Sequence, residues 1–477
     1  MADDYNHGVY GKIKDAVVAD VDEASSAAVA IGVLPVHLVP DYTGLIGVPL
    51  AVNDASAKNA YGYSDSWDKF PLCEAIQAFT GGASGNIGGL YVINVLDPAT
   101  HKAVSDTTAS VTFTDGIGTI VDELAILATI SVDGITAANT SATYDFSTGV
   151  TTIKATGATG SKNVTYRRVD PTAVTATEVV AAVEAVDDLY PLSNVVPNVL
   201  LAPGWSENAA VYAALVSKAQ GIDGHFLAFV LADIPTTSSS DTIEEAIAWK
   251  AANGYTSKYS KVCWPCAKDV GGKVYHLSTL FAREMLRNDA LADGVPYISA
   301  SNTSIAGGGV CLADGTPVKM YNEHGNQLNA YGISTAIAWG GDVRLWGGHT
   351  AGYIAGSSSQ DASAIFDTNI RMLCYIANGF QTRWIDEIDQ PMTLALRETI
   401  LFKEQAILDG LVAQGALVGN PQIVFVPASN PVENIIQGEF TWDLSATPTP
   451  QFKTARVVVA YTTDGFDAYI AGEGEGE

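Results

Sequence analysis

Two long stretches of helical periodicity dominate the C-terminal part of the chain. The first, Ala364 to Phe380, places its apolar residues at three- and four-residue steps and therefore on one face. The second runs from Met392 to Leu411 in the same way and follows Pro391, which suits a first helical turn because its missing N–H has no partner there. The glycine-containing segment Gly410 to Gly419 marks its end. The pattern predicts two packed helices without a cluster of catalytic side chains.

Strand-like and helix-like patterns alternate through the middle of the chain. Short apolar runs predict buried strands at Ala27–Leu38, Leu90–Leu96, Asn198–Ala202, His225–Leu231 and Tyr259–Trp264. Helices are predicted at Leu72–Thr80, from Thr175 to about Leu189, and at Asn208–Ala219, Asp241–Asn253 and Leu277–Arg287. Thr175 and Glu178 match a capping box at the start of the second of these helices. The alternation predicts a parallel sheet with right-handed crossovers.

The amino-acid composition changes between about Lys102 and Pro171. Thr, Val, Ser and Gly dominate this segment, and short β-prone runs follow one another, among them Ile126–Val132 and Val150–Ile153. Ser147-Thr-Gly149 separates two of the runs and predicts a hairpin. We interpret the segment as a small all-β module inserted into the surrounding domain.

The predicted fold class is mixed α/β and multidomain, with a parallel-rich α/β domain, an inserted β module, a C-terminal α+β domain and extended terminal β arms. Further strands are expected at Gln422–Val426 and Glu439–Leu444, with Thr447–Pro450 as a stiff spacer. The predicted boundaries are an N-terminal arm over 1–24, the α/β domain over 25–101 and 172–330, the insert over 102–171, the C-terminal domain over 331–454, and a C-terminal arm with an acidic tail over 455–477.

The two ends of the chain each carry a β-prone run without a local partner. The candidate residues are Val9, Tyr10 and Ile13 in the first run, and Val457, Val459 and Tyr461 in the second run, Ala455–Tyr461. An unpaired strand invites pairing with another chain. The alternative is that both runs join the chain's own sheet.

Composition narrows the class of partner. The 477 residues are 47% apolar and 16% charged, with a formal net charge of −27, which fits a globular protein and argues against nucleic acid, because phosphate binding needs clustered Lys and Arg. The sequence shows no signal-peptide pattern and no apolar run of the ~20 residues that a bilayer span needs. Five widely spread cysteines do not form a disulfide framework, so we expect synthesis in a reducing cytoplasm and no membrane insertion.

The strongest enzymatic candidate is Cys263-Trp-Pro-Cys266, which resembles a thiol–disulfide redox motif. The residues that follow, Ala267 to Gly272, are typical of a turn and not of the helix that would stabilise a thiolate. No second closely spaced Cys or His pair completes a zinc site, and no nucleophile elbow or phosphate-binding loop occurs. We therefore predict no catalytic residue, no cofactor and no metal.

Several segments, in this order, resemble contractile tail sheath proteins of bacteriophages and related contractile injection particles. They are His7–Tyr10, Ala28–Pro35, Gly88–Val95, Asn198–Ser206, Pro296–Asn302, Arg344–Gly347 and Gly415–Gly419. None is a catalytic signature, but their order and spacing together are specific. The insert lies outside the resemblance, as is typical of a variable outer domain.

The resemblance implies a structural subunit that is not an enzyme. Such subunits stack as six-fold rings around an inner tail tube, in a helical homopolymer that also meets baseplate and tail terminator proteins. The arms would pair with a neighbour's C-terminal domain, which would be the inner, tube-facing domain. Its available positive charges are Arg371, Arg383, Arg397 and Lys403, interleaved with acids. Contraction would draw on lattice contacts, and the protein would reside in a virion tail or a released contractile particle assembled in the bacterial cytoplasm.

Two other classes of protein share some of these features. A Cys-x-x-Cys oxidoreductase would need a reactive Cys263. An adhesive or surface-layer assembly protein would share the Thr-rich insert, but it would also carry an export signal, which this sequence does not show.

Overall fold

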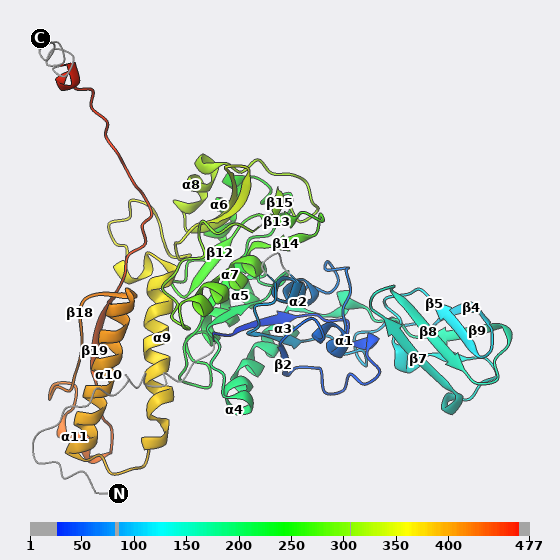
Figure 1. Cartoon of the computed structure of the whole chain (residues 1–477). Coiled ribbons are helices and arrows are strands. Elements are labelled where there is room, and N and C mark those ends of the chain that lie inside the picture. The colour runs from blue at the N-terminus through cyan, green and yellow to red at the C-terminus, as the bar shows by residue number, and fades with distance from the viewer. Residues whose placement is uncertain (1–25, 82–84, 306, 467–477) are drawn as a thin grey trace, which may run out of the picture.

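An eight-stranded sheet forms the centre of the chain (Figure 1). The computed structural model describes residues 26–81, 85–305 and 307–466. In sheet order the strands are β17 (Asp342–Trp346), β16 (Ile333–Trp339), β12 (Ser260–Cys263), β11 (Phe229–Asp233), β10 (Val199–Leu201), β1 (Ala28–Gly32), β3 (Leu90–Asn94) and β2 (Pro49–Val52). The strands from β16 to β3 run parallel, and the edge strands β17 and β2 are antiparallel to their neighbours. The predicted parallel-rich α/β domain is confirmed.

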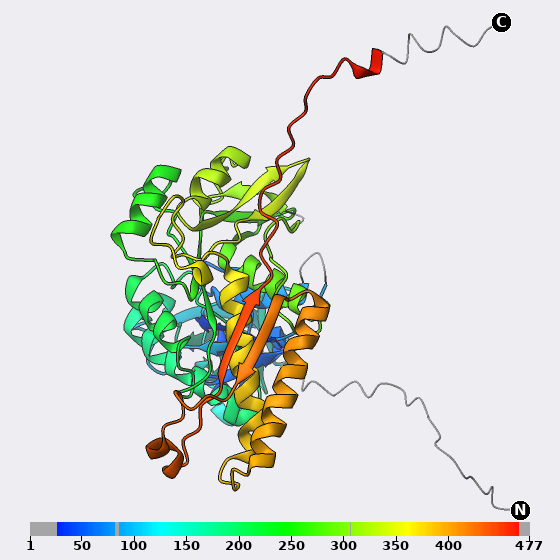
Figure 2. The same ribbon diagram turned by 90° about the vertical axis from the view of Figure 1, so that its left-hand side faces the viewer.

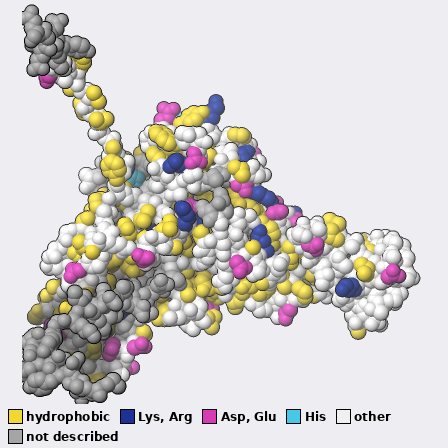
Figure 3. All heavy atoms as spheres, in the orientation of Figure 1, with side chains coloured by type: hydrophobic (Ala, Val, Ile, Leu, Met, Phe, Trp, Pro, Cys, Tyr) yellow, Lys and Arg dark blue, Asp and Glu magenta, His cyan; other side chains and the backbone are white. Residues whose placement is uncertain are grey.

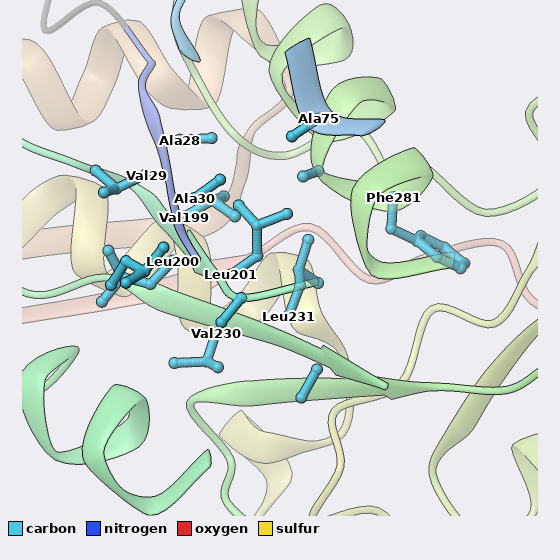
Figure 4. Close-up of a cluster of buried hydrophobic side chains, with 14 of the residues drawn as sticks. Ala28, Val29, Ala30, Ala75, Val199, Leu200, Leu201, Val230, Leu231 and Phe281 are labelled. Atoms are coloured by element: carbon cyan, nitrogen blue, oxygen red, sulfur yellow. The ribbon is translucent and has the colours of Figure 1, made fainter. Parts of the chain in front are cut away.

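Helices cover both faces of the sheet, and the side chains on both faces of the central strands are therefore buried. In Figure 4, Val29, Leu200 and Val230 lie among the buried side chains of β1, β10 and β11. The helices are α1 (Ala57–Tyr61), α2 (Leu72–Gly81), α3 (Ala176–Ala182), α4 (Leu189–Ser193), α5 (Ala209–Lys218), α6 (Ile243–Ala252), α7 (Leu277–Leu291) and α8 (Asn322–Asn329). α2 packs beside α7, and α3 packs beside α5. Near-continuous apolar strands are what such two-sided burial requires.

Local signals predicted most of these helices correctly. The capping box at Thr175 is present, with the Thr175 N–H donating to the Glu178 carboxylate at 2.7 Å. The predicted strand at His225–Leu231 is displaced, since β11 begins only at Phe229. The reason is a tight turn in which Asp223 and Gly224 take positive φ and Ile222 forms a β-bridge with Phe226. His225 and Phe226, the first residues of the predicted strand, belong to this turn.

The insert is a β module with its own hydrophobic core, and it projects from one end of the α/β domain (Figure 1). One sheet contains β4 (Thr107–Phe113), β9 (Gly160–Tyr166) and β6 (Ser131–Val132), and the other contains β5 (Ile117–Ile120), β8 (Val150–Ala155) and β7 (Thr140–Asp145). The hairpin predicted at Ser147 joins β7 to β8. The strand predicted over Ile126–Val132 is wrong for most of its length, because Leu127–Thr129 forms a 3₁₀ turn.

A small antiparallel sheet follows the Cys263-Trp-Pro-Cys266 motif. Its order is β14 (Val274–His276), β13 (Cys266–Asp269) and β15 (Gly307–Cys311). The turn that the sequence predicts over Ala267–Gly272 therefore begins only after Asp269. The burial of the first two residues of β13 and its pairing with a strand on each side outweigh the local turn signal.

The C-terminal unit combines a helical hairpin with a two-stranded sheet (Figure 2). Its elements are α9 (Asp367–Trp384), α10 (Leu394–Gln414), β18 (Leu417–Val424), α11 (Val432–Ile436) and β19 (Asp443–Pro448). Gly415 ends α10 in the left-handed conformation, as the glycines indicated.

Two predictions for this unit are wrong in their boundaries. The strand expected over Glu439–Leu444 begins only at Asp443, as β19, and it continues into the segment expected to be a stiff spacer. Thr447 and Pro448 of that spacer pair with β18, because the facing strand offers them backbone partners. The eight-stranded sheet includes β16 and β17, which follow residue 330.

Candidate assembly surfaces

The β18–β19 pair is a sheet of only two strands. α10 packs against β18 and α9 packs against β19, and Leu408, Leu417 and Ile423 are buried between these elements. Within the described ranges, neither strand has a second strand partner. Because two-stranded sheets are marginal on their own and open edges accept further strands, this pair is a platform on which additional strands can be added.

The segment after β19 is anchored at its root. The Thr449 N–H donates to the Ala416 carbonyl at 3.0 Å. The Gln451 side chain donates to Asp367 Oδ1 at 3.2 Å and to Thr368 Oγ1 at 2.9 Å, at the start of α9. These contacts fix the direction in which the chain leaves the C-terminal unit.

Beyond Gln451 the chain extends away from the body of the subunit (Figure 2). Five apolar side chains of this C-terminal arm are between 81% and 92% exposed, namely Phe452, Val457, Val458, Val459 and Tyr461. Figure 3 shows hydrophobic atoms along the arm. Of the predicted arm residues, Val457, Val459 and Tyr461 therefore lie on an extended segment that joins no strand of the described chain. Val9, Tyr10 and Ile13 lie outside the described residues.

A buried carboxylate joins the two long helices. Glu404 on α10 is 1% exposed and accepts hydrogen bonds from Arg383 Nη2 at 2.6 Å and Trp384 Nε1 at 2.7 Å. Arg383 and Arg371 are two of the positive charges that the sequence offers in this unit. Both pair with carboxylates of the same chain. Arg383 pairs with Glu404, and Arg371, which is 3% exposed, forms an ion pair with Asp289 on α7. Ser26, the first described residue, donates to the same Asp289 at 2.9 Å.

A second buried ion pair fixes α9 to the central sheet. Lys261 on β12 lies 3.0 Å from Asp367, and neither side chain is more than 2% exposed. The Lys261 ammonium also donates to the carbonyls of Gly347 and His349. Asp367 therefore touches the α/β sheet through Lys261 and the arm root through Gln451. α9, the arm root and the sheet thus meet at one buried carboxylate.

The redox candidates are not built as a thiol–disulfide site. Cys263 and Cys266 are 0% and 4% exposed. Burial raises the pKa of both thiols well above the ordinary value, with the Asp233 carboxylate adding to the effect. A catalytic thiol that exchanges disulfides with other proteins needs a lowered pKa and an accessible sulfur, and here a strand follows Cys266 where a helix N-terminus would be required.

A polar cluster lies where the parallel strands end, the usual ligand position in open α/β sheets. Asp233, the last residue of β11, accepts from the Ser278 N–H at 3.0 Å and so caps α7. His276 Nδ1 lies 2.7 Å from Glu74 on α2. Leu72 and Trp205 occupy the adjoining space, each with an atom 3.4 Å from the point where a Cβ on Gly32 would stand. Side chains thus fill this end of β1.

This cluster makes stability depend on pH. Burial alone lowers the pKa of His276, but Glu74, Asp233 and Glu207 outweigh it and raise that pKa from 6.5 to about 10. Burial raises the pKa of Asp233 and Glu207 as well. Since all three shifts are upward, the folded state binds more protons than the unfolded chain, and stability is lost as pH rises. Glu207 contributes from about 4.5 through about 7, and His276 contributes from about 6.5 through about 10.

We expect the melting temperature to fall across that pH window, by an amount that corresponds to a few kcal/mol at its upper end. Thermal unfolding of His276→Gln at several pH values measures the contribution of the imidazole, and the variant should show a clearly flatter slope. Equal slopes for the variant and the wild type would contradict this assignment.

The described residues contain no helix that is long and apolar enough to cross a membrane. They also contain no group of three His, Cys, Asp or Glu side chains that could hold a metal ion. The surfaces that stand out in this part of the chain are the open β18–β19 edges and the exposed apolar arm.

Comparison with known proteins shows which proteins the chain is similar to. No family model matches the chain. The tail sheath protein of Burkholderia phage BcepMu is 27% identical, over 98% of this chain and 98% of that protein. The contracted helical sheath of the anti-feeding prophage has the same fold, with a TM-score of 0.56 and 14% identity over 96% of this chain and 99% of that one.

A second solved assembly has the same fold. It is the contracted sheath complex of an extracellular contractile injection system, PVC, with a TM-score of 0.57 and 13% identity over 98% of this chain and 100% of that one. Together these findings confirm the resemblance to contractile tail sheath proteins that the sequence motifs indicated.

Proposed function

We propose that this chain is the structural subunit of a contractile tail sheath. The observation that carries the proposal is the similarity to a phage tail sheath protein over 98% of both chains. The exposed apolar arm and the two-stranded platform support it, because both are incomplete in a single subunit. The subunits would polymerise as stacked six-fold rings, and their rearrangement would drive a tube through a target envelope.

The assembly contact that we propose is a sheet shared between subunits. The C-terminal arm, through Val457, Val459 and Tyr461, would add to the β18–β19 platform of a neighbour, and the N-terminal run with Val9, Tyr10 and Ile13 would do the same. Each backbone hydrogen bond formed contributes roughly 0.5–1.5 kcal/mol. Because the arm is extended and anchored only at its root, subunits could reorient during contraction without losing this contact.

The remaining partners follow from the same proposal. The C-terminal unit would face an inner tail tube, and the end rings would meet baseplate and tail terminator proteins. The β insert would form an outer domain, which agrees with its position at the end of the α/β domain farthest from α9 and α10 (Figure 1). We propose no catalytic role, and the free energy for contraction would come from lattice contacts and not from nucleotide hydrolysis.

Negative-stain microscopy of the purified full-length protein tests the proposal. We expect tubes or striated polysheaths at high protein concentration, because the arms favour pairing between copies. A protein that stays monomeric at every concentration and salt condition would sink the sheath proposal. Co-purification with tube and baseplate proteins from the same gene cluster would test the partners separately.

A further inference from the structure

Three cysteines lie in or beside β13, and the two that are close in the sequence belong to different sheets. Cys263 ends β12 in the large sheet, whereas Cys266 begins β13 in the small sheet. Across the β13–β15 ladder, Cys266 stands directly opposite Cys311, which is 45 residues later in the chain. The pairing is antiparallel and its register is regular from Cys266 to Lys268.

This register places the two cysteines side by side on neighbouring strands. Residues directly opposite on antiparallel strands project from the same face, with Cβ atoms about 4.5–5.5 Å apart. A disulfide needs Cα atoms about 4.4–6.8 Å apart and a slightly shorter Cβ separation, so a small adjustment of the two strands suffices. Both cysteines are free and buried, with Cys266 4% and Cys311 0% exposed.

The surroundings distinguish this pair from Cys263. Burial, the carboxylates of Asp233, Glu74 and Glu207, and then the Cys311 thiol all raise the pKa of Cys266. Burial and the Asp233 and Asp367 carboxylates raise the pKa of Cys263, and the Lys261 ammonium lowers it. The Cys311 thiol is thus among the groups that raise the pKa of Cys266 and not among those that act on Cys263.

We propose that Cys266 and Cys311 form a reversible disulfide when the protein meets a peroxide oxidant, and that this pair, and not Cys263 with Cys266, is the redox-active one. One thiol attacks hydrogen peroxide, so that the O–O bond breaks, a sulfenic acid forms and water leaves. The second thiol then attacks that sulfur, the S–S bond forms, the S–O bond breaks and a second water leaves. Two protein thiols are oxidised and one peroxide is reduced to two waters.

The bond would close a loop that contains β14 and all of α7. Because α7 carries Asp289, the partner of Arg371 and Ser26, the link would restrain the helix that connects the small sheet to the C-terminal unit. A link over such a long segment restricts the unfolded chain strongly. The raised thiol pKa values keep oxidation slow at neutral pH, since the thiolate is the reactive form. That the protein meets oxidants after release from a cell rests on the proposed function, whereas the chemistry does not.

Peptide mapping of the wild-type full-length protein tests this directly. The protein is treated with hydrogen peroxide, its remaining thiols are alkylated in denaturant, and a digest without reductant is read by mass spectrometry. We expect a Cys266–Cys311 cross-linked peptide, faster formation at higher pH, and an upward shift of the melting temperature that a reductant reverses. Cys263→Ala, the matched control, should retain the cross-link, and Cys311→Ala should lose it.

Two results would overturn the proposal. One is a Cys263–Cys266 link. The other is a sample in which another buried thiol is fully oxidised while Cys266 and Cys311 are both still alkylated, and therefore still reduced. Neither result depends on polymerisation, because the experiment reads the thiols of the subunit in any assembly state. Conversely, a protein that forms the link but no tubes would leave this inference standing while the sheath proposal fails.

Discussion

A chain that ends at residue 454 should fold normally and form no tubes. The residues removed make no strand pairing within the described subunit, and the apolar ones, Val457 to Val459 and Tyr461, are more than four-fifths exposed. Their loss therefore costs the subunit almost no burial. A shared sheet between copies, in contrast, would lose several backbone hydrogen bonds at each contact, and this loss is multiplied along a polymer.

Sedimentation and negative-stain microscopy measure the polymer, and circular dichroism with thermal unfolding checks the fold. The matched control is a chain truncated after Ala471, which removes only the acidic Gly-Glu tail and should still polymerise. A second variant, Val457→Asp with Val459→Asp, keeps the full length and should block assembly as the truncation does. Normal tubes from the chain ending at residue 454 would disprove the role of the C-terminal arm.

Asp367→Ala should cause a large loss of stability. It leaves the Lys261 ammonium, 0% exposed, without its carboxylate in the centre of the sheet. Removing one partner of a buried ion pair typically costs about 3–5 kcal/mol, because the remaining charge stays desolvated. The Gln451 contact at the arm root is lost as well, so assembly should weaken even where the subunit remains folded.

Urea unfolding followed by tryptophan fluorescence gives the change in the free energy of unfolding. The double variant Lys261→Met/Asp367→Asn removes both charges and should recover much of the loss, because no unpaired buried charge remains. Lys258→Ala, which removes an exposed ion pair with Asp361, is the matched control and should change stability by less than ~1 kcal/mol. If Asp367→Ala were no more costly than this control, the buried pair would not hold α9 to the sheet.

Periodic patterns predicted the regular parts of this molecule well. The stripes along α9 and α10, the apolar runs of β1, β3, β10 and β12, and the capping box at Thr175 are local signals, and local hydrogen bonds and burial decide those elements. Ala455–Tyr461, predicted as a strand, pairs with no strand of the described residues. Its pairing with a neighbour stays a prediction.

Non-local contacts set the features that the sequence did not predict. Nothing near Arg371 or Lys261 in the sequence indicates that each meets a carboxylate many residues away, at Asp289 and Asp367. The segment before α9 that contains Trp339 and Trp346 is rich in Gly and has strong turn signals, and the sequence indicates no strand partner for it. Only the folded sheet shows that β16 lies beside β12. The same holds for β13, whose neighbours come from two distant segments.

The root of the β insert has a practical consequence for the particle. Its entering and leaving segments lie side by side, joined by a bridge between Lys102 and Val169 and by the Ala103 N–H donating to the Arg168 carbonyl at 2.8 Å. A module attached through two adjacent chain ends tolerates insertion of further sequence, provided that the contacts of Glu123 and Ile126 with the α/β domain are kept. The part of the insert away from these contacts is therefore suited to carrying a foreign domain, which the proposed polymer would display many times.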